Sequence, residues 1–93
     1  MKNGKPKHPL AKIRERNGLT QNQLGILVGQ SGNRIALFEG GFQYVPFSVF
    51  YKLSEHFDIQ PEEFEQEITN YTIAYQEWIV ENMKSRTLDQ DRA

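Results

Sequence analysis

The sequence predicts an all-α fold of five helices around one core, with a further helical segment at the C-terminal end. Three observations lead to this prediction. Apolar residues recur at spacings of three and four between the turn signals. Helix-start residues such as Thr20 and Pro61 precede these segments, and glycines such as Gly29 follow them. A longer apolar stripe with helical spacing begins at Phe64 and continues beyond the five-helix region.

The first predicted helix spans residues 9–17 and follows a basic segment. Residues 1–8 are rich in Lys, Gly and Pro, so we expect them to form a flexible basic arm. Pro9 suits the first turn of a helix, and Leu10 and Ile13 then point inward.

Two short helices joined by a tight turn form the centre of the chain. Thr20 and Gln23 make a capping box before residues 21–28, and Ser31 caps residues 32–39. Glycines follow both helices and end them. Two helices of about two turns with so short a connection are typical of a helix-turn-helix unit, whose second helix lies in the DNA major groove.

The next two helices have comparable start signals. Pro46 begins a helix that runs to about residue 57, with apolar residues at helical spacing. Pro61, with Glu62 and Glu63 in the first turn, begins the fifth helix.

An aromatic stripe continues from the fifth helix into the tail. Its members are Phe64, Ile68, Tyr71, Tyr75 and Trp78, at alternating spacings of four and three. The pattern predicts a helix over residues 65–83, followed by a frayed tail over residues 84–93.

Two interpretations of this stripe remain open. Ile68, Tyr71, Tyr75 and Trp78 either fold back on the domain's own core or contact a second copy of the chain or a partner protein. In the loop before Pro46, we expect one of the rings of Phe42 and Tyr44 to pack on the core and the other to contact a second subunit.

Composition and charge limit the classes of function. The 93 residues form one domain, without cysteine, membrane span or signal peptide, which suits a cytoplasmic protein. Net charge is −1, but residues 1–16 carry +5, whereas residues 42–64 and 65–93 carry −3 each. A basic start supplies cations for phosphates, and Lys5 and Lys7 are its candidates; a merely solvated start is the alternative.

No pattern of residues supports catalysis or a cofactor. His8 and His56 are far apart and have no convergent carboxylates, so no metal site is expected. Gly29-Gln-Ser-Gly-Asn33 lacks the last glycine of a nucleophile elbow. We therefore expect neither an enzyme nor a small-molecule ligand.

The chain resembles the phage-repressor-like helix-turn-helix proteins, also called the Cro/C1 type or Xre family. The resemblance covers residues 10–64 without a gap and implies a lambda-repressor-like domain over residues 9–64. The residues that carry it are Leu10, Ile13, Arg14, Gly18-Leu19-Thr20-Gln21, Leu24, Gly29, Ser31, Ile35, Glu39, Gly41, Leu53, Phe57, Ile59 and Phe64.

The resemblance implies roles for several residues. An ion pair between Arg14 and Glu39 ties the first helix to the third, although Arg14 could instead be solvated or face a phosphate. Gln21 and the start of its helix grip a phosphate, a role that the free N–H groups there also favour; Gln21 could also be only a capping-turn residue. Ser31 is a further candidate for phosphate contact.

The helix over residues 32–39 has to read the bases. Asn33 suits adenine, Arg34 suits guanine or a phosphate, and Leu37 can touch a thymine methyl group. Gly32 offers no side chain at a position that often reads a base, so few side chains of this helix are available to contact the bases.

The sequence thus predicts a sequence-specific transcriptional regulator of double-stranded DNA, acting as a homodimeric repressor. The alternative is a protein-interaction module, an antitoxin or accessory subunit, that binds a partner through the aromatic C-terminal helix.

Overall fold

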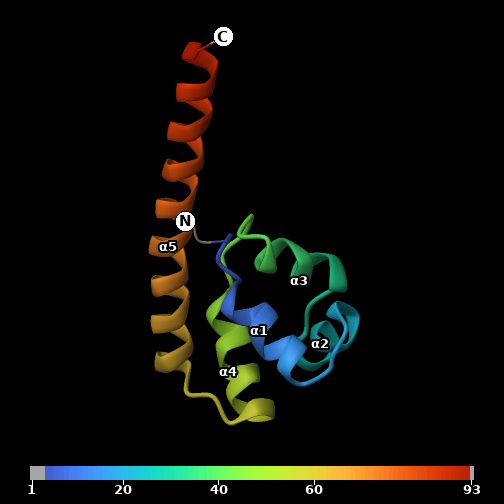
Figure 1. The fold of residues 1–93 in the computed structure, drawn as a ribbon. Helices are drawn as coiled ribbons and strands as arrows, with labels where there is room; N and C mark the ends of the chain where they lie inside the picture. The colour runs from blue at the N-terminus through green and yellow to red at the C-terminus, as the bar shows by residue number, and fades with distance from the viewer. Residues whose placement is uncertain (1–3, 93) are drawn as a thin grey trace.

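The computed structural model describes residues 4–92, and the side chains of residues 4–84. It contains five helices and, among the described residues, no strand. They are α1 (Pro9–Arg16), α2 (Gln21–Val28), α3 (Gly32–Glu39), α4 (Phe47–Phe57) and α5 (Pro61–Arg92). Figure 1 shows α1 to α4 gathered in one bundle, with α5 running along its side and far beyond it. The predicted all-α fold is confirmed.

One core joins the first four helices to the start of α5. Burial of one large apolar side chain contributes roughly 1.5–3 kcal/mol to the free energy of unfolding, so burial of the core residues dominates the stability of the domain. The rings of Phe50 and Phe64 meet edge to face with their centroids 5.1 Å apart, which links α4 to α5. The core residues are Leu10, Ile13, Leu24, Val28, Ile35, Phe38, Val49, Phe50, Leu53 and Phe64.

The ends of the helices follow the predicted signals, with one exception. Thr20 Oγ1 accepts a hydrogen bond from the Gln23 N–H at 3.1 Å, and Gln23 Oε1 accepts one from the Thr20 N–H at 2.9 Å. Gly29 ends α2 in the left-handed conformation, with φ of 73°. Helix α4 ends in the same conformation at Asp58, with φ of 55°. No glycine marks that position, so the sequence did not reveal how α4 ends.

Helix α5 is one continuous helix of 32 residues. It includes both the segment 65–83 and all but the last residue of the segment 84–93. Residues 84–92, expected to form a frayed tail, thus continue the helix in this structure, and Ala93 lies outside the described residues. No glycine or proline follows Pro61, and the polar end is rich in good helix formers, so nothing local ends the helix near Met83.

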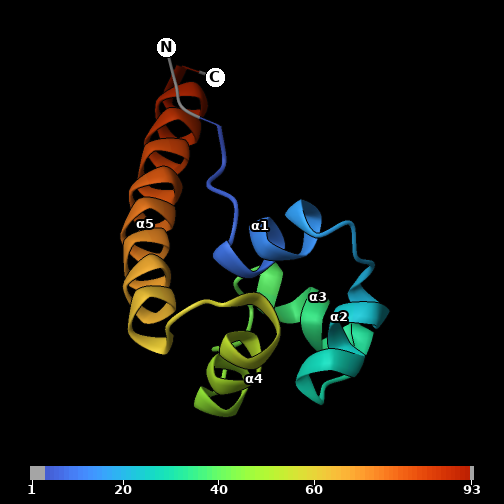
Figure 2. The same ribbon diagram turned by 90° about the horizontal axis from the view of Figure 1, so that it is seen from below.

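Residues 4–8 lie along α5 (Figure 2). His8 is only 4% exposed, and its Nδ1 accepts a hydrogen bond from the Leu10 N–H at 3.0 Å, so that it caps α1. Its ring also meets the ring of Tyr71, with 4.7 Å between centroids. Residues 4–8 thus have contacts with α1 and α5 that the expectation of a flexible arm did not include, and residues 1–3 lie outside the described part of the chain.

Burial changes the acid–base chemistry of this contact. Desolvation lowers the pKa of His8 from 6.5 to about 4, although the carboxylate of Glu39 acts in the opposite direction. Desolvation also raises the pKa of the Tyr71 phenol, and Tyr75 adds to this rise. Neutral His8 is the form that caps α1, because a protonated Nδ1 cannot accept the hydrogen bond from Leu10.

Candidate nucleic-acid interface

The two faces of α3 differ in chemistry. Ile35 and Phe38 are fully buried, which fixes the rotation of the helix about its axis. Asn33 and Arg34 are exposed on the other side, and Leu37 is 37% exposed beside them. The helix thus presents an amide, a cation and one apolar side chain to solvent from a rigid support.

The turn between α2 and α3 depends on Gly25. A side chain at this position would collide with the backbone carbonyl of Gln30. Glycine at position 25 thus makes room for the turn that precedes α3.

Asn22 is a candidate contact residue that the sequence analysis missed. Its side-chain amide lies against Gly32, in the space that a Cβ at position 32 would fill. Gly32 therefore leaves no gap at the start of α3, since an exposed amide from α2 lies there. The only sequence signal was the pairing of a polar residue in the first turn of α2 with a glycine in the first turn of α3.

Ser31 and Arg34 both have contacts at the start of α3. Ser31 Oγ accepts a hydrogen bond from the Arg34 N–H at 3.1 Å and so caps the helix. The Arg34 guanidinium carbon lies 5.2 Å from the centroid of the Phe38 ring. A guanidinium placed over a ring is partly oriented, while its donors stay available on an exposed side chain.

Arg14 and Glu39 form a bidentate ion pair between α1 and the end of α3. Arg14 Nε lies 2.6 Å from Glu39 Oε2, and Nη2 lies 3.0 Å from Oε1. Arg14 Nη1 also donates to the backbone carbonyl of Leu19 at 2.9 Å. The hydrogen bond to Glu39 raises the pKa of the guanidinium further. The two side chains are 17% and 9% exposed, so the pair is structural rather than solvated.

Gln21 is joined to this ion pair. Its Nε2 donates to Glu39 Oε1 at 3.2 Å. The side chain is half-buried and held in place by the carboxylate. A phosphate at the start of α2 would therefore meet the backbone N–H groups of the first turn beside a fixed Gln21.

The basic residues of the arm do not face α3 in this structure. Lys7 Nζ pairs with Glu15 on α1, and Lys5 Nζ lies over the rings of Tyr75 and Trp78 on α5. Figure 2 shows the arm beside α5, with α2 and α3 on the far side of α1. The two lysines predicted to contact phosphates are thus engaged within the chain.

The aromatic stripe on α5 is partly buried and partly exposed. Ile68 is partly buried against the core, and Tyr71 is only 9% exposed. The chain's own core and His8 thus cover much of these two side chains, which agrees with the interpretation that they pack on the domain, whereas their contact with a partner stays a prediction. Tyr75 and Trp78 are half-buried and carry Lys5.

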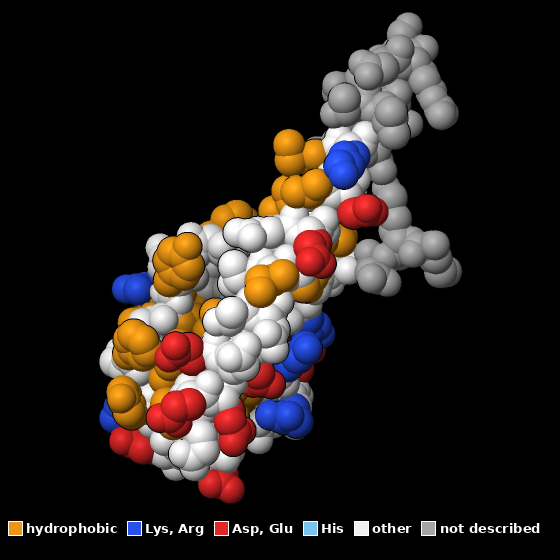
Figure 3. Space-filling view, turned by 90° about the vertical axis from the view of Figure 1, so that its left-hand side faces the viewer, with side chains coloured by type: hydrophobic (Ala, Val, Ile, Leu, Met, Phe, Trp, Pro, Cys, Tyr) orange, Lys and Arg blue, Asp and Glu red, His pale blue; other side chains and the backbone are white. Residues whose placement is uncertain are grey.

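Several other large apolar side chains are exposed. Phe42 and Tyr44 are 76% and 92% exposed, so the expectation that one of them packs on the core is wrong. The loop that carries them and α5 border a groove of about 400 Å³ with no Lys, Arg, Asp or Glu in its lining. Figure 3 shows hydrophobic side chains on a flank of the bundle and along the protruding helix, with acidic side chains between them.

Two other kinds of site have no candidate within the described residues. No group of three His, Cys, Asp or Glu side chains could hold a metal ion there. In the same part of the chain, no helix has the length and apolar character needed to cross a membrane.

Comparison with known proteins supports the fold. No family model matches the sequence, and no curated protein matches it. A solved structure of similar fold is that of an addiction module antidote protein of a HigA family from Coxiella burnetii, with a TM-score of 0.60 and 18% sequence identity. The similarity covers 94% of this chain and 95% of that chain, so it takes in most of α5 as well as the bundle.

Proposed function

We propose that this chain binds double-stranded DNA sequence-specifically, with α3 in the major groove, and regulates transcription. The observation that supports this proposal is the two-faced α3, with Ile35 and Phe38 buried and Asn33 and Arg34 exposed. An α-helix fits the major groove, and side chains on its outer face reach the base edges.

Each exposed side chain has a proposed target. Asn33 makes a bidentate contact with adenine, Arg34 reads guanine from its position over Phe38, and Leu37 packs on a thymine methyl group. Asn22, which lies on Gly32, adds a second amide at the start of the helix. The proposed readout is therefore richer than α3 alone provides.

Phosphate contacts set the position of the helix in the groove. We assign them to the start of α2 with Gln21, to Ser31 at the start of α3, and to Lys5 and Lys7 of the arm. The hydrogen bond from Gln21 to Glu39 orients this corner before DNA arrives. Such contacts give affinity and salt dependence without sequence preference.

Dimerisation belongs to the same proposal. A single α3 presents few base-reading side chains, so specific binding calls for two copies on a two-fold site, with their recognition helices about 34 Å apart. The exposed rings of Phe42 and Tyr44, directly after α3, support a contact between copies at this position. A dimer of this kind that covers a promoter acts as a repressor.

Selection from a random pool of DNA duplexes tests the proposal. The selection is run at low salt and again near physiological salt, and the molar mass of the protein is measured on the same sample. We expect an enriched palindrome that persists at the higher salt, bound by a dimer. If no sequence is enriched and binding disappears as the salt concentration rises, α3 does not recognise a specific DNA sequence.

A second candidate function is that of an antidote-like subunit that holds a partner protein on α5. Two observations favour it: the structural similarity to an addiction module antidote extends over most of α5, and α5 exposes Ile73 and Val80 one heptad apart. In a test, a partner that co-purifies with the full chain should be lost with Ile73→Lys plus Val80→Lys. The matched change Glu65→Lys plus Thr69→Lys on exposed positions of the same helix should retain it.

A further inference from the structure

The arm lies on a row of three aromatic rings along α5. We call Tyr71, Tyr75 and Trp78 the aromatic row. Tyr71 stacks on Tyr75 with 5.6 Å between centroids, and Trp78 follows at 6.0 Å from Tyr75. His8 meets the first ring, and Lys5 Nζ lies 5.6 Å from the second and 6.0 Å from the third. Two residues of the arm, Pro6 and Lys7, therefore separate its two contacts with the same row.

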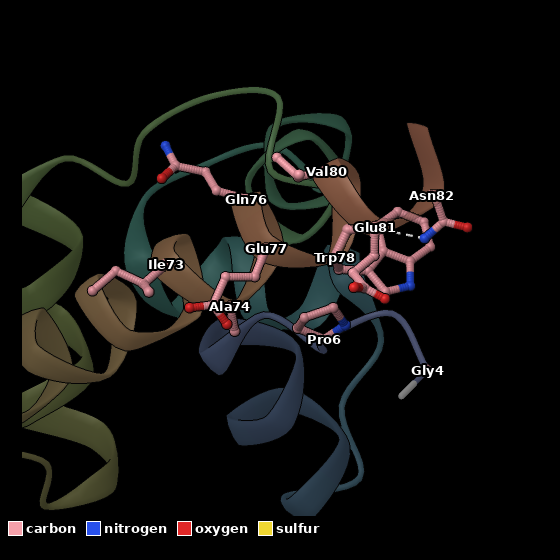
Figure 4. Close-up of a pocket in the computed structure, with 10 residues that line it drawn as sticks. All are labelled: Gly4, Pro6, Ile73, Ala74, Gln76, Glu77, Trp78, Val80, Glu81 and Asn82. Carbon is pink, nitrogen blue, oxygen red and sulfur yellow. Dashed lines mark hydrogen bonds between the residues drawn. The ribbon is translucent and has the colours of Figure 1, made fainter. Parts of the chain in front are cut away.

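The end of the arm near Trp78 borders a half-open pocket beside α5. Gly4 and Pro6 line one side of this pocket of about 770 Å³, and α5 lines the other, including Trp78, Glu77 and Glu81 (Figure 4). The arm and α5 are therefore not closely packed against each other at this end.

The two contacts differ in strength. His8 is buried and hydrogen-bonded to the first turn of α1, so its end of the arm is fixed. Lys5 is exposed, and a cation over a ring at an exposed site changes a population only by roughly two- to five-fold. Both side chains of the Lys7–Glu15 ion pair are about half exposed, so this pair also stabilises the docked arm only slightly. Residues 4–7 can therefore leave α5 while His8 stays in place.

DNA offers the same lysines an alternative partner. Phosphates attract Lys5 and Lys7 more strongly than exposed rings do at low salt, because each cation also releases condensed counterions. In the docked position, however, the arm lies beside α5 (Figure 2), and Lys5 contacts rings of α5. Lys5 can serve only one of the two partners at a time.

We infer that the aromatic row is a docking surface for the chain's own arm, and that Lys5 is exchanged between this row and DNA phosphates. The inference rests on the proposed function. In this exchange the aromatic row and DNA compete for Lys5. A change that strengthens docking of the arm on the row therefore weakens DNA binding. It also links α5, where no base or phosphate contact is assigned, to affinity for DNA.

The direction in which one substitution changes the affinity for DNA distinguishes this exchange from a purely structural role of α5. Tyr75→Leu keeps an apolar side chain but removes the nearer of the two rings beneath Lys5. If Lys5 is exchanged, this variant binds a short duplex of mixed sequence roughly two- to five-fold more tightly than wild type at low salt. A merely structural role for Tyr75 predicts unchanged or weaker binding, and that result would overturn the inference.

Docking itself can be measured without DNA, because Trp78 is the single tryptophan of the chain. Quenching of its fluorescence by acrylamide, a neutral molecule, reports how well the arm covers it. Lys5→Met keeps the length of the side chain and removes its charge, so quenching should rise. Lys12→Met, on an exposed lysine of α1, should leave it unchanged. Equal quenching in wild type and Lys5→Met would show that Lys5 does not dock.

The same signal then follows the exchange. The mixed-sequence duplex is added at low salt, and its binding is recorded separately by the anisotropy of a label on the DNA. Quenching of Trp78 in wild type should rise to the level of Lys5→Met, and Lys5→Met should show no further rise. Binding of the duplex with unchanged quenching would overturn the exchange and leave the proposed function intact. Absence of duplex binding, with a docked arm, would instead refute the proposed function.

Discussion

The side-chain amide of Asn22 lies against the α-carbon of Gly32, in the place of the side chain that position 32 lacks. The two residues belong to the first turns of α2 and α3, so they join the two helices at the edge of the proposed interface. In the sequence, Gly32 suggested that a base-reading side chain was missing. In the structure, the absence of a side chain at Gly32 leaves room for the amide of Asn22 from the neighbouring helix.

Gly32→Ala should weaken specific DNA binding without unfolding the domain. The new Cβ would collide with the end of the Asn22 side chain, which can swing into solvent, whereas the backbone of Asn22 stays at 3.3 Å. We expect affinity for the selected duplex to fall by about 1 kcal/mol, and Asn22→Ala to cause a similar loss. The double variant should lose no more than either single one, because both remove the same contact. Additive losses would mean that the two residues act separately.

Gly25→Ala is a contrasting change in the same pair of helices. Here the new Cβ meets the backbone carbonyl of Gln30, which cannot swing away. The turn has to shift, and we expect the free energy of unfolding to fall by about 1–3 kcal/mol, less what alanine gains in helix propensity. Urea unfolding of the variant measures this loss. A gain in stability would show that the turn before α3 yields easily.

Arg14→Met should destabilise the domain strongly. It leaves the Glu39 carboxylate, which is 9% exposed, with only the hydrogen bond from Gln21. Loss of one partner of a largely buried pair costs about 3–5 kcal/mol in the free energy of unfolding. Arg14→Lys should cost less, since it keeps the charge but not the bidentate geometry. Arg16→Met, on the exposed face of α1, is the control and should change stability by no more than about 0.5 kcal/mol.

Asn33→Ala and Lys7→Met should affect DNA binding in different ways. The first should cost about 1–3 kcal/mol with the selected sequence and little with duplexes changed at the base pair that Asn33 reads. The second should weaken binding to all sequences and reduce the salt dependence by about one unit of slope. Affinities across a set of single base-pair changes distinguish the two patterns. An equal loss from Asn33→Ala for every sequence would contradict its role in readout.

Protonation of His8 should destabilise the fold in mild acid. Its pKa is lowered from 6.5 to about 4 by burial, so the unfolded chain binds the proton first as the pH falls. Stability is unaffected above about pH 6.5 and is lost between that value and about pH 4. From the two pKa values, the loss at about pH 5 is on the order of 2 kcal/mol. Urea unfolding at about pH 7 and about pH 5 measures it.

The matched variant for this effect is His8→Asn. Asparagine can cap α1 with its side-chain oxygen but does not titrate, so the variant should lose the difference in stability between the two pH values. His56→Asn, an exposed position on α4, should leave that difference in place. A difference that survives His8→Asn would have to come from other groups.

The bundle could be predicted because its signals are local. Capping boxes, Pro at helix starts and apolar spacing depend on neighbours within about four residues, and these placed the first four helices and the start of the fifth. The core residues followed from the same spacing. The end of α4 at Phe57 was also predicted, but the left-handed conformation of Asp58 after it was not, because no glycine marks that position.

The surroundings of the site depend on contacts that no local pattern contains. Asn22 and Gly32 lie ten positions apart, and His8 and Tyr71 meet across most of the chain. A Lys- and Pro-rich start looks like a solvated arm, because its composition does not show that α5 offers it three rings. The exposed rings of Phe42 and Tyr44 were also misjudged, since aromatic character alone does not tell core from surface.

The length of α5 affects how this protein diffuses. The radius of gyration is 15.7 Å, whereas a compact chain of this size has about 12 Å, and the longest dimension is 52 Å against 24 and 21 Å for the others. A rod attached to a small sphere meets more friction than a sphere of equal mass. A single copy will therefore elute early from a sizing column, at a volume that suggests a larger particle. The number of copies on DNA has to be counted by light scattering or sedimentation equilibrium, which weigh the particle whatever its shape.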